Sequence, residues 1–556
     1  MPWYSLRFKV SVRHCNRCAT EEICKWYFLC YKLIYSGHLN VPTTSLGLAM
    51  GWVSLVSGER EEGTRIGEEA EGARVVAAAA TTFLASLVGV PLSARALTYG
   101  RKFALIATSL CFVLCWSLKL AGGGWWVVTA RVAAGLGGAG AYSISPLVAR
   151  EMCEERIRGA AAAALVPAHN IGFLLMYLAA DFAVPHQTVL WICLGMSLLH
   201  CAVFLLVPES PAYLAANKRD KEAVASLAWL RGVDVHNPSL VEELAALPPP
   251  DTAGISSFAL LKDMLGNVSR RRAFIISFIA IVGQEACGVY TLMQFAERTF
   301  VLARDEDSPT TSALEMYHPN ATEILNATNV VNVTNVLSAT SALNVTSALN
   351  ATALDHGLYA MNATLVVQTN ALLTPARQAV VLGAVQLVAS TIALYLVERV
   401  GRRRLLVTSA FVTGGCLALA TAAAWLGRGQ WAGLALAGAV AADNVGLQPA
   451  PYALLADMFH YQFRSAAIML ASAAACIANA VEVVVFPALA ASCGLPSALL
   501  LAALLTGLYT LFALLAVPET RGLTPEHIYR LLDKKKDGEK DEKKENNDQE
   551  PENTRV

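Results

Sequence analysis

Three carboxylic acids and one arginine lie inside long apolar stretches of this 556-residue chain. The acids are Glu285, Asp443 and Glu482, and the base is Arg131. An unpaired charge at the centre of a bilayer costs at least about 2.5 kcal/mol, so each carboxyl needs a proton, a partner or water. Three kinds of chemistry are therefore open: proton coupling, a structural pair with Arg131, or contact with a substrate in a water-lined cavity.

Composition indicates that the elements positioning these residues are membrane helices. Hydrophobic residues make up 55% and charged residues 15% of the chain, and the mean hydropathy is +0.46, whereas soluble domains carry about 25% charged residues. A bilayer span needs about 20 apolar residues. Residues 39–57, diluted by Pro42 and Asn40, predict a weak first helix. Eleven stronger spans are predicted at residues 73–92, 102–121, 125–149, 159–181, 188–207, 273–296, 376–397, 404–426, 431–456, 465–488 and 496–517.

Six N-x-T tripeptides crowd into one segment between two of these spans. Glycans are attached to such sites only on the lumenal side of secretory membranes. The segment therefore predicts a long, glycosylated extracellular loop over residues 301–375, with acceptors at Asn320, Asn326, Asn332, Asn344, Asn350 and Asn362.

Basic residues cluster at helix ends on the opposite face, which predicts that this face is cytoplasmic. Twelve spans then place both termini in the cytoplasm of a multi-pass plasma-membrane protein. We expect an all-α membrane protein with two six-helix bundles, divided as follows: residues 1–38 a cytoplasmic N-terminal segment, 39–207 the first bundle, 208–272 a cytoplasmic helical linker, 273–517 the second bundle, and 518–556 a disordered cytoplasmic tail.

Charged residues recur at corresponding helix ends of the two halves, which indicates an internal duplication. Gly100-Arg101-Lys102 follows the second span, and Gly401-Arg402-Arg403-Arg404 follows the eighth. Acids and guanidinium groups at such ends can form bidentate pairs, although single basic residues there could merely obey the orientation rule. We expect a cytoplasmic gate that joins the halves when the inner side is closed, formed by Arg101, Glu151, Arg158, Glu209, Glu398, Arg399, Arg402, Arg403, Asp457, Arg464 and Glu519.

Five motifs in the order expected for one family make the interpretation more specific. The chain carries Arg131-Val-Ala-Ala-Gly-Leu-Gly through Glu151 and Arg158-Gly159, then Pro208-Glu-Ser-Pro, Gly401-Arg-Arg and Pro518-Glu-Thr-Arg-Gly. In these it resembles the sugar porter family of the major facilitator superfamily over residues 46–530. Leu46 to Trp52 and Asn170-Ile-Gly172 are most similar to insect facilitated trehalose transporter-like proteins.

The resemblance implies which residues face the substrate. The helix 7 motif of the family falls on Gln284-Glu285-Ala-Cys-Gly288-Val-Tyr290, and the helix 10 motif on Gly446-Leu-Gln448-Pro-Ala-Pro-Tyr452. Amides donate to and accept from hydroxyls, and aromatic faces pack on the apolar side of a sugar ring. The implied substrate contacts are Gln284, Glu285, Gly288, Tyr290, Gln448, Tyr452 and Asn170, and the alternative role for the polar ones is hydrogen bonding between helices.

Departures from the family pattern leave the cargo open. Glu285 stands where a second glutamine is usual, the helix 5 glutamine falls on Val166, and the asparagine and tryptophan of helix 11 fall on Ala475 and Cys476. The first span has no acid, unlike the proton symporters that the chain resembles, which favours facilitated diffusion of a trehalose- or hexose-class sugar. Alternatives are a non-transporting sugar sensor or receptor, a proton-coupled carrier, and an organic-ion carrier that uses Glu285 and Asp443.

Other functions have little support in the sequence. Equal numbers of basic and acidic residues, 43 of each, give no indication of nucleic-acid binding. The chain has no phosphate-binding loop, so neither an enzyme nor a cofactor is predicted. His14, Cys15, Cys18 and Cys24 lack a second ligand pair, so no metal site is predicted. Thr554-Arg-Val556 resembles a ligand for PDZ domains.

Overall fold

The computed structural model describes residues 39–58, 65–122, 125–153, 164–246, 257–296, 298–300, 374–459 and 461–532. The predictions for residues 1–38, for the six glycosylation sites, for Arg158 and for Thr554–Val556 lie outside these ranges. The side chains of Glu398 and Arg464 are also outside the description.

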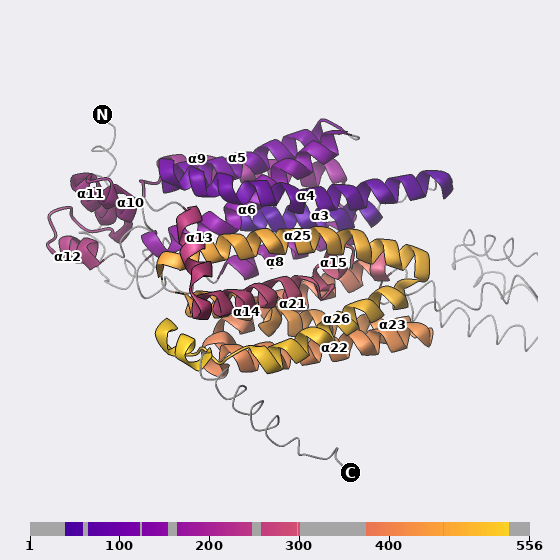
Figure 1. Cartoon of the computed structure of the whole chain (residues 1–556). Coiled ribbons are helices and arrows are strands. Elements are labelled where there is room, and N and C mark those ends of the chain that lie inside the picture. Colours follow the sequence, from indigo (N-terminus) through magenta and orange to yellow (C-terminus); the bar gives the residue numbers. More distant parts are fainter. Residues whose placement is uncertain are drawn as a thin grey trace, which may run out of the picture.

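Six long helices form the first half of the molecule. α3 packs against α8 and α6, α4 against α6, and α5 against α6 and α9. Four shorter helices, α10 to α13, follow α9 and lie at one end of the body (Figure 1). The bounds are α3 Val41–Gly58, α4 Arg65–Tyr99, α5 Arg101–Leu120, α6 Trp125–Met152, α8 Leu165–Asp181, α9 His186–Leu206, α10 Pro211–Ala216, α11 Asp220–Arg231, α12 Ser239–Ala246 and α13 Ser257–Gly266.

The second half repeats this plan with two interrupted helices. α22 packs against α26 and α23, while α14 packs against α25 and α24. The bounds are α14 Val268–Glu285, α15 Val289–Gln294, α21 Pro375–Val400, α22 Arg402–Trp425, α23 Gly429–Ala442, the π-helical turn η1 Asp443–Leu447, α24 Pro449–Met458, α25 Tyr461–Cys493 and α26 Leu495–Ala516.

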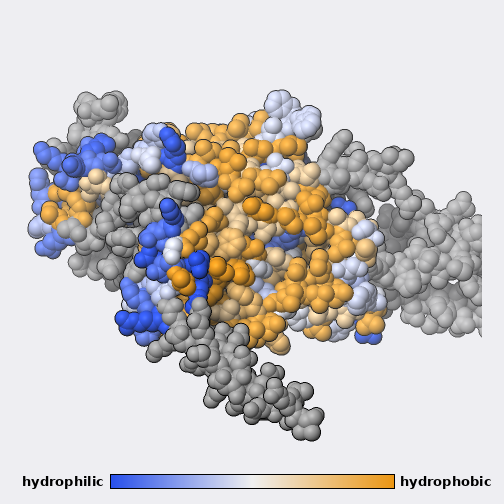
Figure 2. Space-filling view, in the orientation of Figure 1, coloured by the Kyte–Doolittle hydropathy of each residue, from blue (hydrophilic) through white to orange (hydrophobic). Residues whose placement is uncertain are grey.

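Within the described ranges, nine helices are long and apolar enough to cross a membrane. Three further segments, α3, α8 and the series α23, η1 and α24, complete the two halves. Figure 2 shows hydrophobic residues over the sides of the helical body, while hydrophilic residues gather at the end that carries α10 to α13. This distribution suits a body surrounded by lipid, because apolar side chains there face hydrocarbon rather than water.

Two helices of the second half are interrupted. Between α14 and α15, Gly288 adopts a left-handed backbone with φ of 82°, a conformation that glycine adopts without steric cost. Between α23 and α24, η1 widens the helix by π-type turns, which are frequent at functional sites. Both breaks lie next to residues implied as substrate contacts, namely Gln284 and Gln448.

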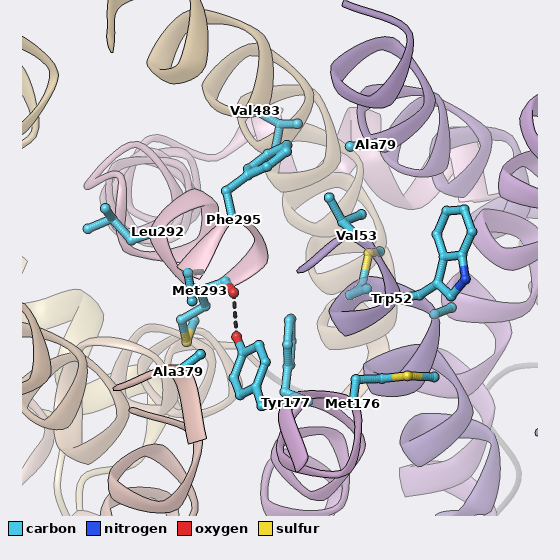
Figure 3. Packing of buried hydrophobic residues seen from close by; sticks show 14 of the residues in the cluster. Trp52, Val53, Ala79, Met176, Tyr177, Leu292, Met293, Phe295, Ala379 and Val483 are labelled. Carbon is cyan, nitrogen blue, oxygen red and sulfur yellow. Dashed lines mark hydrogen bonds between the residues drawn. The ribbon is translucent and has the colours of Figure 1, made fainter. Parts of the chain in front are cut away.

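The two halves meet along two helix pairs. α4 lies against α25 and α8 against α21, and α15 also contacts α3. Figure 3 shows part of this junction, where the Tyr177 hydroxyl of α8 donates a hydrogen bond to the Met293 carbonyl of α15. Phe295 and Val483 of the second half lie near Val53 and Ala79 of the first in the same view. The core is therefore continuous from one half to the other at this level.

Glycines permit the closest helix approaches within the first half. A Cβ added at Gly47 of α3 would lie 2.0 Å from the His169 carbonyl oxygen, and one at Gly172 would lie 2.4 Å from the Thr44 carbonyl oxygen. A Cβ at Gly135 of α6 would lie 2.2 Å from the Thr82 carbonyl oxygen of α4. The glycine-rich run of α6 therefore serves helix packing and not a dinucleotide.

Candidate functional site

Four polar side chains form a hydrogen-bonded group on one face of the second half. Gln284 Nε2 donates to Gln448 Oε1 at 3.2 Å and to Glu285 Oε1 at 3.3 Å. Asn479 Nδ2 of α25 donates to the other Glu285 oxygen at 3.1 Å. The structure thus brings together three of the implied contacts, from α14 and the start of α24, and adds a fourth residue from α25.

Two tyrosines line the approach to this group from the end that carries α10 to α13. Tyr142 on α6 is 42% exposed and Tyr452 on α24 is 37% exposed. Both lie within electrostatic range of the Glu285 carboxyl. α6 and α24 both run on from these tyrosines toward that end of the body, so the two partly exposed rings lie on that side of the polar group.

Amides also join the halves directly beside the site. Asn170 Nδ2 of α8 donates to Asn444 Oδ1 of η1 at 3.1 Å, and Gln386 Nε2 of α21 donates to Asn170 Oδ1 at 2.7 Å. All three side chains are buried. Asn170, expected as a substrate contact, is therefore occupied in this conformation by hydrogen bonding between helices.

Tyr290 and Gly288 have structural roles on the opposite side of the helix break. The Tyr290 ring packs edge-on against Phe83 of α4, with centroids 5.5 Å apart, and against Phe173 of α8 at 6.2 Å. A Cβ at Gly288 would lie 2.9 Å from the Ala502 Cβ. In this conformation Tyr290 therefore closes an aromatic contact between the halves, and Gly288 supplies the turn that places it there.

The remaining intramembrane acids lie close to this group. The Gln448 side chain lies beside the Asp443 carboxyl, yet neither Asp443 oxygen has a donor in good geometry among the described residues. Glu482 Oε1 accepts a hydrogen bond from the Thr291 backbone N–H at 2.9 Å. None of the described ion pairs involves these acids or Glu285, so each carboxyl still needs a proton, water or a substrate group to compensate it.

Arg131 lies elsewhere, which removes one of the roles open at the sequence level. Its guanidinium donates to the Ala49 carbonyl oxygen at 2.7 Å and lies over the Trp52 ring, with Cζ 5.1 Å from the centroid. No described carboxylate pairs with it. Among the described residues, Arg131 therefore forms no pair with an intramembrane acid in this conformation, because α3 holds its guanidinium.

The charge set at the end that carries α10 to α13 forms compact clusters, the first of them at the ends of α5 and α6. Arg101 binds Glu151 through two guanidinium nitrogens, with the shortest distance 2.8 Å. Ser210 Oγ donates to Glu151 at 2.5 Å. Glu209 Oε1 accepts the backbone N–H groups of Arg101 and Lys102 at 2.9 and 3.0 Å. The Glu209 carboxylate therefore sits at the N-terminus of α5, where the helix dipole favours negative charge.

The second half repeats this cluster residue for residue. Arg402 Nε lies 2.9 Å from Asp457 Oδ2, Thr520 Oγ1 donates to Asp457 at 3.1 Å, and Glu519 Oε1 accepts the Arg402 N–H at 3.0 Å. Arg403 and Arg399 lie at the rim: Arg403 Nη2 donates to the Leu514 carbonyl, and the Arg399 guanidinium lies over Tyr395.

These clusters differ from the expected gate in one respect. Each described pair joins helices of the same half, and none bridges the two halves at this end. The physical reason is that Glu209 and Glu519 cap α5 and α22 of their own halves, which holds each arginine beside its own acid. An interaction of Arg158, Glu398 or Arg464 between the halves lies outside the described side chains.

Sequence reasoning missed Asn479 and Tyr142. The resemblance places the helix 11 asparagine on Ala475, but Asn479 lies one helical turn further along the same face, since residues four apart share a face. Tyr142 follows the glycine-rich run of α6 and lies within electrostatic range of Glu285 in the other half, a placement that depends on how the two halves pack.

Comparison with known proteins identifies the family. The sequence model described as "Sugar (and other) transporter" matches residues 57–335 and 357–532, which is most of the chain. The chain belongs to this family of sugar and other transporters. The expectation of a transporter and not an enzyme agrees with this membership.

Curated members of the sugar and other transporter family match only part of the chain. A quinate permease of Neurospora africana is 29% identical over 163 residues, which cover 26% of this chain and 30% of the permease. The high-affinity hexose transporter HXT6 of Saccharomyces cerevisiae is 27% identical over 190 residues, covering 33% of this chain and 32% of the transporter. The chain thus matches about a third of the length of these relatives.

Solved structures match the chain along nearly its whole length. The inward-open xylose transporter XylE from E. coli superposes with a TM-score of 0.64 at 17% identity, covering 91% of this chain and 100% of that one. The proton:xylose symporter XylE bound to 6-bromo-6-deoxy-D-glucose gives 0.59 at 18% identity, covering 90% and 100%. At this identity the likeness establishes the major facilitator fold alone.

Proposed function

We propose that this chain is a facilitative carrier for a trehalose- or hexose-class sugar. The observation that carries the proposal is the hydrogen-bonded group of Gln284, Glu285, Gln448 and Asn479, whose carboxyl lies within electrostatic range of the partly exposed Tyr142 and Tyr452. Paired amides and a carboxylate match the alternating donors and acceptors of sugar hydroxyls. The two tyrosine rings offer faces for the apolar side of the sugar.

Alternating access follows from where the halves touch. The described polar contacts between the halves begin at Asn170 and continue along α8, away from the end that carries α10 to α13. The last of them joins Arg377 Nε and Asp181 Oδ1, which are 3.5 Å apart. At the other end the charge clusters stay within their halves, so each half can rotate as a unit. We infer that the site in this conformation is closed on the side of the Arg377–Asp181 pair and opens toward α10 to α13.

The membrane topology is part of the proposal. The nine apolar helices together with α3, α8 and the interrupted series from α23 to α24 give twelve spans. Basic helix ends place α10 to α13 in the cytoplasm, and the N-x-T cluster places residues 301–375 outside. Both termini would then be cytoplasmic in a plasma-membrane glycoprotein, with the C-terminal tripeptide available to a PDZ domain.

The choice of sugar has two lines of support. The names of the relatives, hexose transporters and quinate permeases, all concern small polyhydroxylated molecules. The run from Leu46 to Trp52 resembles insect trehalose transporter-like proteins and, in the structure, packs α3 against α8.

Uptake of labelled sugars tests the proposal. Cells that express the chain would be given trehalose and a panel of monosaccharides at two external pH values, with surface expression measured in parallel. We expect saturable, pH-independent uptake of at least one sugar and its loss in the double variant Gln284→Ala, Gln448→Ala. Sugar binding at the surface without uptake would contradict the proposal and favour a sensor.

A second candidate function is the transport of organic cations, and a third is proton-coupled transport. One observation favours both. Glu285, Asp443 and Glu482 are buried together with no described basic partner, which attracts positive charge. Glu285→Gln distinguishes the candidates, because it removes the charge and keeps a hydrogen-bonding side chain. A sugar uniporter would retain most of its uptake, whereas an organic-cation carrier would lose it and a proton-coupled carrier would lose its pH dependence.

A further inference from the structure

Two buried cations share one aromatic ring in the first half. Lys119, near the end of α5, is 5% exposed, and Arg131, near the start of α6, is 1% exposed. The Lys119 Nζ lies 3.9 Å from the centroid of the Trp52 ring, and the Arg131 Cζ lies 5.1 Å from it. Both charges therefore lie within about 9 Å of one another, a distance at which like charges repel appreciably in a buried site.

Hydrogen-bond donors in this cluster outnumber acceptors. The Lys119 Nζ, the Arg131 Nε and the Trp116 indole Nε1 are buried without an acceptor among the described residues. The Lys119 ammonium also lies 4.3 Å from the centroid of the Trp116 ring. Each buried donor left unpaired destabilises the folded state, so a cluster with donors alone indicates an acceptor that the protein does not itself supply.

The surroundings offer no negative side chain within the described part of the chain. The groups in electrostatic range of Lys119 are Cys115, Arg131 and Cys193. The Trp52 indole N–H is already directed to His186 Nε2 at 2.8 Å, so it does not serve Lys119 or Arg131. Cation–π contacts compensate part of the charge, but they provide no acceptor for the N–H groups.

We propose that the cluster of Lys119, Arg131, Trp52 and Trp116 binds a small inorganic anion such as chloride. A monovalent anion accepts from several donors at once and cancels repulsion between the two cations. The buried position favours a monatomic anion over a multivalent oxyanion, which loses more hydration on entry. This site is separate from Gln284 and Gln448, so the inference stands whichever substrate is carried.

Thermal unfolding of the purified full-length protein tests the site. Sodium chloride would replace sodium gluconate stepwise at constant ionic strength. Because a ligand that binds only the folded state stabilises it, we expect the unfolding temperature to rise by about 2 °C or more and then to saturate. Lys119→Met should abolish the rise, and Trp116→Phe, which keeps the ring and removes a donor, should raise the chloride concentration at half-effect severalfold.

Arg219→Gln is the matched control, because Arg219 forms an exposed ion pair with Glu222 at the start of α11. It should keep the full chloride dependence. An unfolding temperature that does not respond to chloride would overturn the inference, as would an equal response in Lys119→Met. If Lys119→Met fails to fold, an unchanged half-effect concentration in Trp116→Phe would overturn it equally.

Discussion

Asn479 shows how one side chain completes the candidate site. Its amide donates to the Glu285 oxygen that Gln284 leaves free. Glu285 is thereby held by an amide from each side, which fixes the direction in which its carboxylate presents lone pairs. A sugar hydroxyl approaching from the Tyr142 side would meet a carboxylate that is already oriented.

Asn479→Leu removes this donor while roughly keeping the volume of the side chain. A hydrogen bond to a charged group contributes about 1.5 to 3 kcal/mol, so we expect the apparent KM for the transported sugar to rise by about tenfold or more. Uptake kinetics at matched surface expression would measure it. Ser492→Ala on the exposed face of the same helix is the control, and an equal KM in Asn479→Leu and the parent protein would remove Asn479 from the site.

Residue types could be predicted from the sequence more reliably than their partners. Gln284, Gln448 and Glu285 were expected to act together, and they share hydrogen bonds. Arg131 was considered as a partner of an acid and instead lies on Trp52. The sequence shows that a buried charge needs compensation, but only the packing of α3 against α6 shows that an aromatic ring supplies part of it.

At the scale of helices, the two charge clusters around Arg101 and Arg402 hold the helix ends together within each half. Arg101 and Glu151 are both buried, with side-chain exposures of 10% and 8%, and Ser210 extends the network to α10. Because the same arrangement recurs around Arg402 and Asp457, each half has one such cluster at the same place.

Glu151→Leu tests the importance of the cluster around Arg101. Removing one partner of a buried pair leaves an uncompensated charge and costs about 3 to 5 kcal/mol, so we expect a marked fall in the unfolding temperature of the purified protein and reduced expression. Glu222→Ala breaks the exposed pair with Arg219, whose side chains are 52% and 58% exposed, and should cost less than about 1 kcal/mol. Equal effects of the two changes would show that the cluster does not stabilise the half.

The lengths of the apolar stretches predicted the positions of the helices well, but they did not predict where helices are interrupted. The span expected at residues 431–456 is broken by η1, which places Asp443 and Asn444 beside the junction of the halves. Glycines and prolines near this point indicate a bend, but a π-type turn depends on how α23 packs against α21 and α22. The weak first span is nevertheless a helix, since its glycines let it approach α8 closely.

For the molecule as a whole, the placement of contacts defines the conformational state. Tyr177, Asp181 and Arg377 join the halves at one end, while Tyr142 and Tyr452 are partly exposed and lie nearer the other. The duplicated motifs predicted two equivalent halves. They could not predict the state, because a carrier of this kind uses the same sequence in each of its conformations.

Thiol labelling tests the direction of access. In a background without the thirteen native cysteines, Tyr142→Cys should react with a membrane-impermeant reagent faster in inside-out vesicles than in intact cells. Trp125 lies at the other end of α6, and its side chain is 84% exposed. Trp125→Cys should therefore show the reverse preference. Faster labelling of Tyr142→Cys from outside the cell would contradict the assigned orientation or state.

The central claim is that this chain carries a sugar by alternating access, and exchange across a sealed membrane tests it most directly. The purified protein would be reconstituted into liposomes loaded with the unlabelled sugar found in the uptake panel, and entry of labelled sugar would be followed. The account predicts entry several times faster than into empty liposomes, with loss of this exchange in the Gln284→Ala, Gln448→Ala variant. Folded protein that binds the sugar and yet exchanges none would contradict it.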